Sequence, residues 1–409
     1  MLTPTLRRRI SEIIRELFDL QHIILVNKDN RDLGPVDIAD LNYDEEMSKA
    51  SSNFDIVPTS QYDYAVMHYT SGTTGKPKGA VHRHQAVVQQ YATGKWALDL
   101  HEDDIYWCTA DPGWVTGTSY GMLAPWSNGV TQLIYEGAFR ASVWYEMIQR
   151  YKVTVWYTAP TAIRMLMKAG EELPKKYDLS SLRYMNSVGE PLNPEAWRWA
   201  YQYLCGDGQW GFLADNWWQT ETGGPCLASL PIMPGKPGKV GKPVPGVVAE
   251  VVDRDGNPIL TPGKGGFLVL KQPFPHMFRT VYGDADRYSS DWNQIPGCYS
   301  TGDVALIDSD GYFMVVGRAD DVLNVSGHRI GSAEVESALV SHDTVAEAAV
   351  IGIPDSIRGE SIKAFVTLRL GINDSEQIID DLKNHVRHEL GPIAIPSFIT
   401  FVDGLPKTR

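Results

Sequence analysis

Short apolar runs alternate with amphipathic segments over the first two-thirds of the chain. Apolar runs rich in β-branched and aromatic residues are typical of buried strands, and apolar residues that recur every three or four positions are typical of helices. The predicted strands are His22–Val26, Ile105–Thr109, Thr131–Tyr135, Val153–Tyr157 and Leu182–Asn186, and the predicted helices include Thr161–Ala169 and Pro194–Tyr203. Because strands and helices alternate, we expect parallel α/β layers.

The pattern changes at Lys236, where short strands interrupted by Gly and Pro begin and continue to residue 317. Such a texture predicts a small β-barrel. Within it, Asp255-Gly256 is a typical hairpin turn, and we expect it to join a strand at Ala249–Val252 to one at Phe267–Leu270.

After Arg318 the pattern predicts a smaller α+β domain. Val335, Ala338 and Leu339 fall on one face of a helix, as do Ile378, Leu382, Val386 and Leu390, while Ala348–Ile353 and Ala364–Leu368 read as strands. The polar segment Ala319-Asp320-Asp321 is the expected boundary. We therefore predict a large domain over residues 1–318, with the barrel at about 236–317, and a mobile C-terminal domain over 319–409.

A candidate phosphate-binding loop follows the apolar run Tyr64–Tyr69, which reads as a buried strand. Residues 71–79 contain three hydroxyls, three glycines and two lysines. Glycines let backbone N–H groups approach an anion, and hydroxyls and lysines add donors and charge. The spacing differs from the G-x-x-x-x-G-K-[ST] pattern, so an ATP-binding loop of another kind is implied. The alternative is a flexible linker. The predicted phosphate contacts are Thr70, Ser71, Gly72, Thr73, Thr74, Gly75 and Lys76.

Composition excludes several classes of protein. The chain has 409 residues, of which 43% are hydrophobic and 21% charged, and its net charge of −13 argues against a nucleic-acid surface. No apolar run approaches the roughly 20 residues of a membrane span. The spacing of the four cysteines matches neither a metal site nor a disulfide framework; they are Cys108, Cys205, Cys226 and Cys298. We therefore expect the protein in the cytoplasm, where thiols stay reduced. The expected partners are small molecules, with neither nucleic acid nor membrane among them.

Four further motifs follow the loop in order: Ser187–Pro191, Asp215–Gly223, Tyr299–Asp303 and Gly317–Arg329. With the loop, they resemble the core motifs of the AMP-forming acyl-CoA synthetases, in the adenylate-forming superfamily. The resemblance covers residues from about 60 to 409. It implies a large α/β domain with a small β-barrel, followed by a smaller α+β domain.

The resemblance also implies roles for individual residues. It assigns nucleotide binding to the loop and to Gly189, Glu190, Pro191, Asp215, Asn216, Trp217, Gln219, Thr220, Asp303, Arg318 and Arg329, and catalysis to Lys78, Thr220, Glu221 and Arg329. Asp303 is expected to hold the ribose hydroxyls, and the less favoured alternative is an Asp that caps a turn. Glu221 is expected to bind Mg²⁺, which needs few protein carboxylates when phosphate oxygens complete its shell.

Trp218 suggests the size of the acid. The resemblance places this indole across the acyl pocket, where relatives that take longer acids have a small residue. With Val115, Thr116 and Val188 it would leave room for a methyl group, so acetate is the expected acid and propionate the next one accepted. The alternative is that Trp218 simply fills the core.

The implied chemistry is activation of acetate by ATP to acetyl-AMP and pyrophosphate, followed by transfer of the acetyl group to coenzyme A. The protein contributes alignment and cancels growing charge. The resemblance places Ser326, Gly327 and Arg387 at coenzyme A and makes Asp320 the hinge of the C-terminal domain. For Arg387, an exposed helix charge is an equal alternative.

Two departures from the family pattern affect the expected activity. The chain stops at Arg409, where the family continues with Ser-Gly-Lys, and the family begins well upstream of Met1. We therefore expect a chain truncated at both ends that binds nucleotide poorly and makes acetyl-AMP slowly or not at all. Medium-chain ligases, peptide-synthetase adenylation modules and an inactive remnant remain alternatives.

Overall fold

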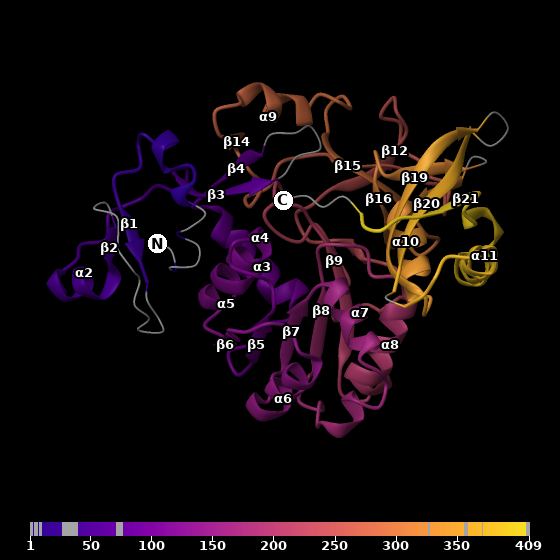
Figure 1. Ribbon diagram of the computed structural model, residues 1–409. Coiled ribbons are helices and arrows are strands. Elements are labelled where there is room, and N and C mark those ends of the chain that lie inside the picture. The colour runs from indigo at the N-terminus through magenta and orange to yellow at the C-terminus, as the bar shows by residue number, and fades with distance from the viewer. Residues whose placement is uncertain are drawn as a thin grey trace. The chain divides into compact units, whose positions relative to one another are not determined.

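The computed structural model describes residues 3, 7, 10–26, 40–70, 77–325, 328–355, 359–369 and 371–405, and at positions 324, 328, 329 and 333 the backbone only. The chain forms two units, residues 1–59 and 60–409 (Figure 1). In the first, η1 (Ile14–Glu16) precedes β1 (Ile23–Leu25), which pairs in parallel with β2 (Asp40–Asn42). Helix α2 (Tyr43–Lys49) follows directly.

A seven-stranded sheet forms the centre of the second unit, in the order β11-β10-β9-β8-β7-β5-β6. Its strands are β5 (Ile105–Cys108), β6 (Thr131–Leu133), β7 (Val155–Thr158), β8 (Tyr184–Ser187), β9 (Phe212–Trp217), β10 (Leu227–Ala228) and β11 (Lys242–Pro243). The five strands from β6 to β9 run parallel, and β10 and β11 are antiparallel additions. The predicted parallel α/β layers are confirmed, with strand ends shifted by one or two residues.

Both faces of this sheet are covered by helices (Figure 1). They are α3 (Ala86–Ala97), α4 (Val115–Thr118), the π-helix η2 (Ser119–Leu123), α5 (Ala124–Ser127), α6 (Ala141–Tyr151), α7 (Pro160–Lys168), η3 (Pro174–Lys176), α8 (Pro194–Cys205) and η4 (Gly206–Gly208). Neighbouring residues of one strand enter different cores: Tyr157 packs with α3 and η2, and Trp156 with α6, α7 and α8. This alternation follows from the two-residue period of a strand.

A three-stranded antiparallel sheet carries the candidate phosphate loop. It consists of β14 (Thr280–Val281), β4 (Lys78–Arg83) and β3 (Tyr64–Thr70), and α9 (Ala285–Asp291) follows β14. The predicted strand at 64–69 exists, but the prediction that it is buried is wrong. Tyr64 is 61% exposed and Tyr69 63% exposed, and His68 is the buried residue of the strand. The reason is that β3 is an edge strand, paired on one side only by β4 among the described residues.

The region predicted as a barrel contains a four-stranded antiparallel sheet. Its strands are β12 (Ala249–Val252), β13 (Gly266–Leu270), β15 (Tyr299–Ile307) and β16 (Phe313–Arg318). The predicted pairing of β12 with β13 is confirmed, and Ala249 lies opposite Leu270. Asp255-Gly256 forms the expected turn: the Asp253 carboxylate accepts from Asp255 N at 2.9 Å, and Gly256 adopts a positive φ of 84° that favours glycine.

The C-terminal region has its own sheet, in the order β18-β17-β20-β19, with β21 paired to β20. Its elements are β17 (Val322–Val325), β18 (His328–Gly331), α10 (Ser332–Ser341), β19 (Val345–Asp355), β20 (Gly359–Leu368), α11 (Glu376–Leu390), η5 (Pro392–Ala394) and β21 (Phe398–Phe401). The predicted helix faces are confirmed for Val335 and Leu382, which are fully buried in one core, but the prediction is wrong for Leu390, which is 39% exposed because it ends α11 beyond that core. Within the described ranges, no helix is long and apolar enough to cross a membrane.

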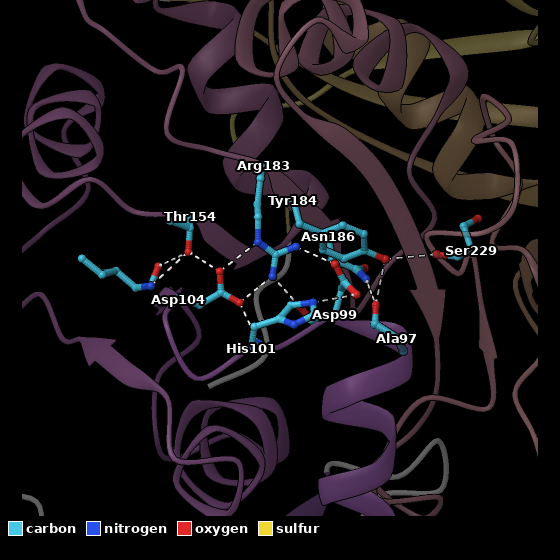
Figure 2. Close-up of polar contacts among 10 residues, drawn as sticks. Ala97, Asp99, His101, Asp104, Thr154, Arg183, Tyr184, Asn186 and Ser229 are labelled. Atoms are coloured by element: carbon cyan, nitrogen blue, oxygen red, sulfur yellow. Dashed lines mark hydrogen bonds and ion pairs between the residues drawn. The ribbon is translucent and has the colours of Figure 1, made fainter.

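A polar network joins the amino ends of three parallel strands (Figure 2). Asp104 precedes β5, Thr154 precedes β7 and Arg183 precedes β8. Arg183 Nε donates to Asp104 Oδ1 at 2.9 Å, and Arg183 Nη1 donates to Asp99 Oδ2 at 2.5 Å. Thr154 Oγ1 donates to the same Asp104 oxygen at 2.7 Å. These contacts fasten the amino edge of the sheet, so this edge serves stability.

Candidate active site

The carboxyl edge of the same sheet carries the segments that the motifs single out. Val188–Pro191 follows β8 and Trp218–Glu221 follows β9. In open α/β sheets, ligands bind at this edge. Two cavities lie there, with volumes of about 550 and 330 Å³, and both are lined by Gln219 and Arg318. Together they have the size of a small-molecule site.

Asp303 lines the smaller cavity and is the centre of a polar cluster. Its Oδ2 accepts from Trp217 Nε1 at 3.1 Å and from Gln219 Nε2 at 2.8 Å. Arg318 Nη1 lies 3.4 Å from Asp303 Oδ1 and donates to Thr301 O at 2.8 Å. Burial raises the pKa of Asp303 to about 6, although Arg318, Trp217 and Gln219 act in the opposite direction. The carboxyl group is thus held by fixed donors and has a pKa close to neutrality.

The smaller cavity is lined by a backbone segment suited to a flat ring. Gly189, Glu190 and Pro191 line it together with Trp217 and Trp218. Gly189 has a φ of 98°, which a residue with a side chain rarely adopts. Glu190 turns toward α7, where its carboxylate accepts from Thr161 N at 3.0 Å and pairs with Arg164. The Glu190 side chain therefore holds the backbone that lines the cavity through its contacts with α7.

The larger cavity contains the charges expected for phosphate chemistry. Lys78 Nζ lies 2.7 Å from Glu221 Oε1 and 3.6 Å from Asp291 Oδ2. Arg287 and Arg318 line the same space, as do Ala319 and Asp320, which follow β16. Four cationic side chains, with Arg254 as the fourth, therefore line a cavity that also holds three carboxylates, an arrangement suited to a polyanion bound together with a divalent cation.

Each of the four successive carbonyl oxygens of residues 220–223 has a nitrogen atom from another segment within hydrogen-bond distance. Phe278 N donates to Glu221 O at 2.7 Å, and Gln90 Nε2 donates to Gly223 O at 3.2 Å. His276 Nδ1 contacts Thr222 O. His82 Nε2 lies 2.9 Å from Thr220 O, and its Nδ1 lies 3.0 Å from His276 O. Thr220 and Glu221 thus stand on a rigid segment, as a preorganised site requires.

Both ring nitrogens of His82 face carbonyl acceptors, so only a doubly protonated ring satisfies the two contacts together. The pKa of His82 is nevertheless lowered, because the effect of burial outweighs those of the two carbonyl groups and Glu221, which act to raise it. The neutral ring therefore donates to one of the two carbonyl oxygens. Burial also lowers the pKa of His276 to about 3, so this ring is neutral and donates from Nδ1.

Trp218, the residue predicted to bound the acyl pocket, borders the smaller cavity. It is 7% exposed and packs in one core with Val188 and Val115. Trp218 Nε1 donates to Tyr157 OH at 3.0 Å, and Tyr157 OH donates to Asn216 Oδ1 at 3.0 Å. The indole is therefore fixed in orientation by a buried chain of hydrogen bonds.

The remaining predicted residues lie apart from the two cavities or outside the described residues. Thr70 ends β3 opposite Lys78, and Thr116 lies half-buried in α4. Asp215 is 2% exposed, accepts from Asn216 N at 3.0 Å, and lines neither cavity. Arg387 is exposed in the last turn of α11. Outside the described residues lie Ser71, Gly72, Thr73, Thr74, Gly75, Lys76, Ser326 and Gly327, and also the side chain of Arg329.

Sequence reasoning missed Asp291, His82, His276 and Gln90. Only His82 carried a signal, since it follows the phosphate loop by a few residues. The others come from segments without motifs, and their role depends on the way distant elements pack.

The site suits a magnesium ion held mainly by a substrate. Among the described residues, no group of three or more His, Cys, Asp or Glu side chains is placed to hold a metal. One cavity does contain the carboxylates of Glu221 and Asp291. Magnesium bound by one or two carboxylates, phosphate oxygens and water fits this donor set.

Comparison with known proteins identifies the family. The family described as AMP-binding enzyme matches residues 9–282, and the AMP-binding enzyme C-terminal domain matches residues 334–409. An acetyl-coenzyme A synthetase of Bacillus subtilis is 47% identical over 407 residues, which are 100% of this chain and 69% of that protein. One of Pyrobaculum aerophilum is 52% identical over 83% of this chain and 52% of its own length.

A solved structure supports the same assignment. The anthranilate CoA ligase AuaEII, in complex with anthranoyl-AMP, superposes with a TM-score of 0.83 at 29% identity, and the match covers 99% of this chain and 74% of that chain. The expected fold, a large α/β domain with a smaller C-terminal domain, is thereby confirmed. The chain spans between 52% and 69% of the length of the two synthetases. Two family models that match most of its residues, together with these relatives, establish that the chain belongs to the family of AMP-binding enzymes.

Proposed function

We propose that this chain is the greater part of an AMP-forming acetate:CoA ligase. The observation that carries the proposal is the pair of adjoining cavities, one bounded by Trp218 and the other containing Lys78 and Glu221. Relatives at 47% and 52% identity are named acetyl-coenzyme A synthetase, which supports acetate as the acid. The substrates are ATP, acetate and coenzyme A.

The proposed roles follow from the placement of the side chains. Asp303 and Arg318 hold the ribose, and Gly189–Pro191 lies against the adenine. Lys78 and Arg329 bind the phosphates, and Glu221 holds Mg²⁺, which when bound neutralises charge that develops on the phosphoryl oxygens. Acetate oxygen attacks the α-phosphorus and pyrophosphate leaves; the thiol of coenzyme A then attacks the acetyl carbon and AMP leaves. The protein aligns the reactants at both steps.

Three further features belong to the proposal. The domain boundary lies at residues 318 and 319, and Asp320 is the hinge about which the C-terminal domain turns between the two steps. Ser326, Gly327 and Arg387 contact coenzyme A. The four cysteines are free, which supports a cytoplasmic location, where thiols remain reduced.

Alkyl esters of AMP test the function without requiring turnover, because they resemble an acyl-AMP but cannot transfer the alkyl group. Calorimetric titration should show that the ethyl and propyl esters bind more tightly than AMP and at least tenfold more tightly than the hexyl ester, since a rigid indole excludes longer chains. Acetate-dependent exchange of pyrophosphate into ATP is the matching catalytic assay. The proposal is contradicted if the short esters bind no more tightly than AMP.

The pKa of Asp303 predicts a pH dependence of nucleotide binding. The folded protein holds this pKa at about 6, above the ordinary 3.8, so the carboxyl group loses its proton as the pH rises through 6. The ionised carboxylate accepts hydrogen bonds from the ribose hydroxyls more strongly than the protonated carboxyl group does. We therefore expect affinity for the propyl ester to rise about tenfold between pH 5 and pH 7.

The propyl ester suits this measurement because its phosphate keeps a single charge, whereas the phosphate of AMP titrates near pH 6. In Asp303→Asn the affinity should be low at every pH. A variant that retained the pH dependence would show that another group titrates.

A further inference from the structure

Asp291 is a buried carboxylate beside the proposed catalytic lysine, and no motif includes it. It is the last residue of α9, its side chain is 7% exposed, and it lines the larger cavity with Lys78 and Glu221. The ammonium group of Lys78 lies 2.7 Å from the Glu221 carboxylate and 3.6 Å from that of Asp291. The lysine thus stands between two carboxylates and bonds closely to one.

The second carboxylate is incompletely paired. Asp291 Oδ2 accepts no hydrogen bond from any described residue, and Arg287 Nε lies 3.8 Å from Asp291 Oδ1. A buried anion without a close partner is costly. Asp291 Oδ2 is therefore positioned to accept a full bond if Lys78 turns toward it.

The metal-binding role proposed for Glu221 requires such a movement. A divalent cation at Glu221 would repel an ammonium group bonded to the same carboxylate, and the repulsion is strong in a site shielded from water. Lys78 cannot leave both anions without exposing a buried negative charge. Asp291 is the second anion within its reach.

We propose that Asp291 is a positioning residue, which accepts Lys78 from Glu221 when Mg·ATP binds and so frees Glu221 for the metal. This inference rests on the proposed function. An ion pair that served the fold alone would affect stability and leave metal affinity unchanged, so the two roles can be separated.

The test is the affinity of Mn²⁺ in the presence of ATP, measured on the full chain by electron paramagnetic resonance. Asp291→Asn should weaken Mn²⁺ binding about 10- to 100-fold, because Lys78 then stays on Glu221 and competes with the metal. Asp291→Glu keeps the carboxylate and should restore most of the affinity. Asp286→Asn, which removes an exposed carboxylate from the same helix, is the matched control and should change nothing.

A double-mutant cycle identifies the lysine as the intermediary. In a Lys78→Gln background, Asp291→Asn should no longer weaken Mn²⁺ binding in the presence of ATP, because the competing ammonium group is gone. Equal losses in both backgrounds, or no loss in either, would overturn the inference. If Asp291→Asn does not fold, the fallback variant is Lys78→Gln, measured without ATP. It should bind Mn²⁺ about tenfold more tightly than the wild type, and an unchanged affinity would also overturn the inference.

The wild-type measurement separates this inference from the proposed function. If ATP does not tighten Mn²⁺ binding to the wild type, the proposed function itself fails. If ATP does tighten it and Asp291→Asn binds Mn²⁺ as the wild type does, only the role of Asp291 is wrong.

Discussion

Trp218→Gly should change the acid preference of the site from two carbons to four or more. The indole is buried, borders the smaller cavity and packs against Val188, so its removal opens volume where the acyl group is expected. Because steric exclusion is lost, binding of the hexyl ester of AMP relative to the ethyl ester should rise by about 100-fold. The measurement is titration with the ester series, followed by exchange assays with acetate, butyrate and hexanoate.

Stability must be separated from specificity in this variant. Removing a buried indole costs about 3–5 kcal/mol of unfolding free energy. Trp199→Ala is the matched control, because Trp199 is also 7% exposed but belongs to the opposite core. The control should lose stability and keep its ester preference. An unchanged preference in Trp218→Gly would place the acyl pocket elsewhere.

Arg183→Ala should be the most destabilising change at the amino edge of the sheet. Arg183 is the cation of the network in Figure 2, and its loss leaves Asp104, with a side chain 3% exposed, without its charge partner. We expect a loss of about 2–3 kcal/mol, below the value for a fully buried pair because one-third of the guanidinium side chain is exposed. The measurement is the urea midpoint at pH 7.

The pH dependence gives a second criterion for Arg183. Burial acts to raise the pKa of Asp104, but hydrogen bonds from Arg183, Thr154 and His101 N outweigh it, and the pKa is lowered from 3.8. A carboxyl group whose pKa is lowered by folding stabilises the folded protein at every pH above the pKa that it has in the unfolded chain. This stabilisation is lost as the pH falls below that value and through the pKa of the folded state. The difference in unfolding free energy between the wild type and Arg183→Ala should therefore become smaller below about pH 4.

An exposed ion pair provides the control for Arg183. Lys152 Nζ lies 2.9 Å from Asp178 Oδ2, and both side chains are more than half exposed. Lys152→Ala should cost less than about 1 kcal/mol. Similar midpoints for the two variants would show that the network in Figure 2 contributes no more than a surface pair.

Patterns along the chain predicted the layers of the large unit well. The alternation of strands and helices, the turn at Asp255-Gly256 and the buried faces of α10 and α11 all depend on local periodicity and turn chemistry. Motifs also predicted that Asp303, Arg318, Gln219 and Glu221 would meet, and they line two adjoining cavities.

The exposure of β3 shows where pattern reasoning fails. An apolar run predicts a strand, but whether that strand is buried depends on the elements that cover its faces and on its place in the sheet. Since β3 lies at an edge, Tyr64 and Tyr69 remain exposed. The local sequence was enough to predict the strand, whereas its burial depends on the rest of the fold.

The sequence by itself determined the type and order of the elements, the family and most of the candidate site, because these depend on neighbouring residues and on ordered motifs. Only the tertiary structure decided how the site is supported. Contacts from α3, β4 and the segment before β14 hold the carbonyl groups of residues 220–223, and α9 brings Asp291 to Lys78. These contacts join residues far apart along the chain, so they exist only once the layers have packed.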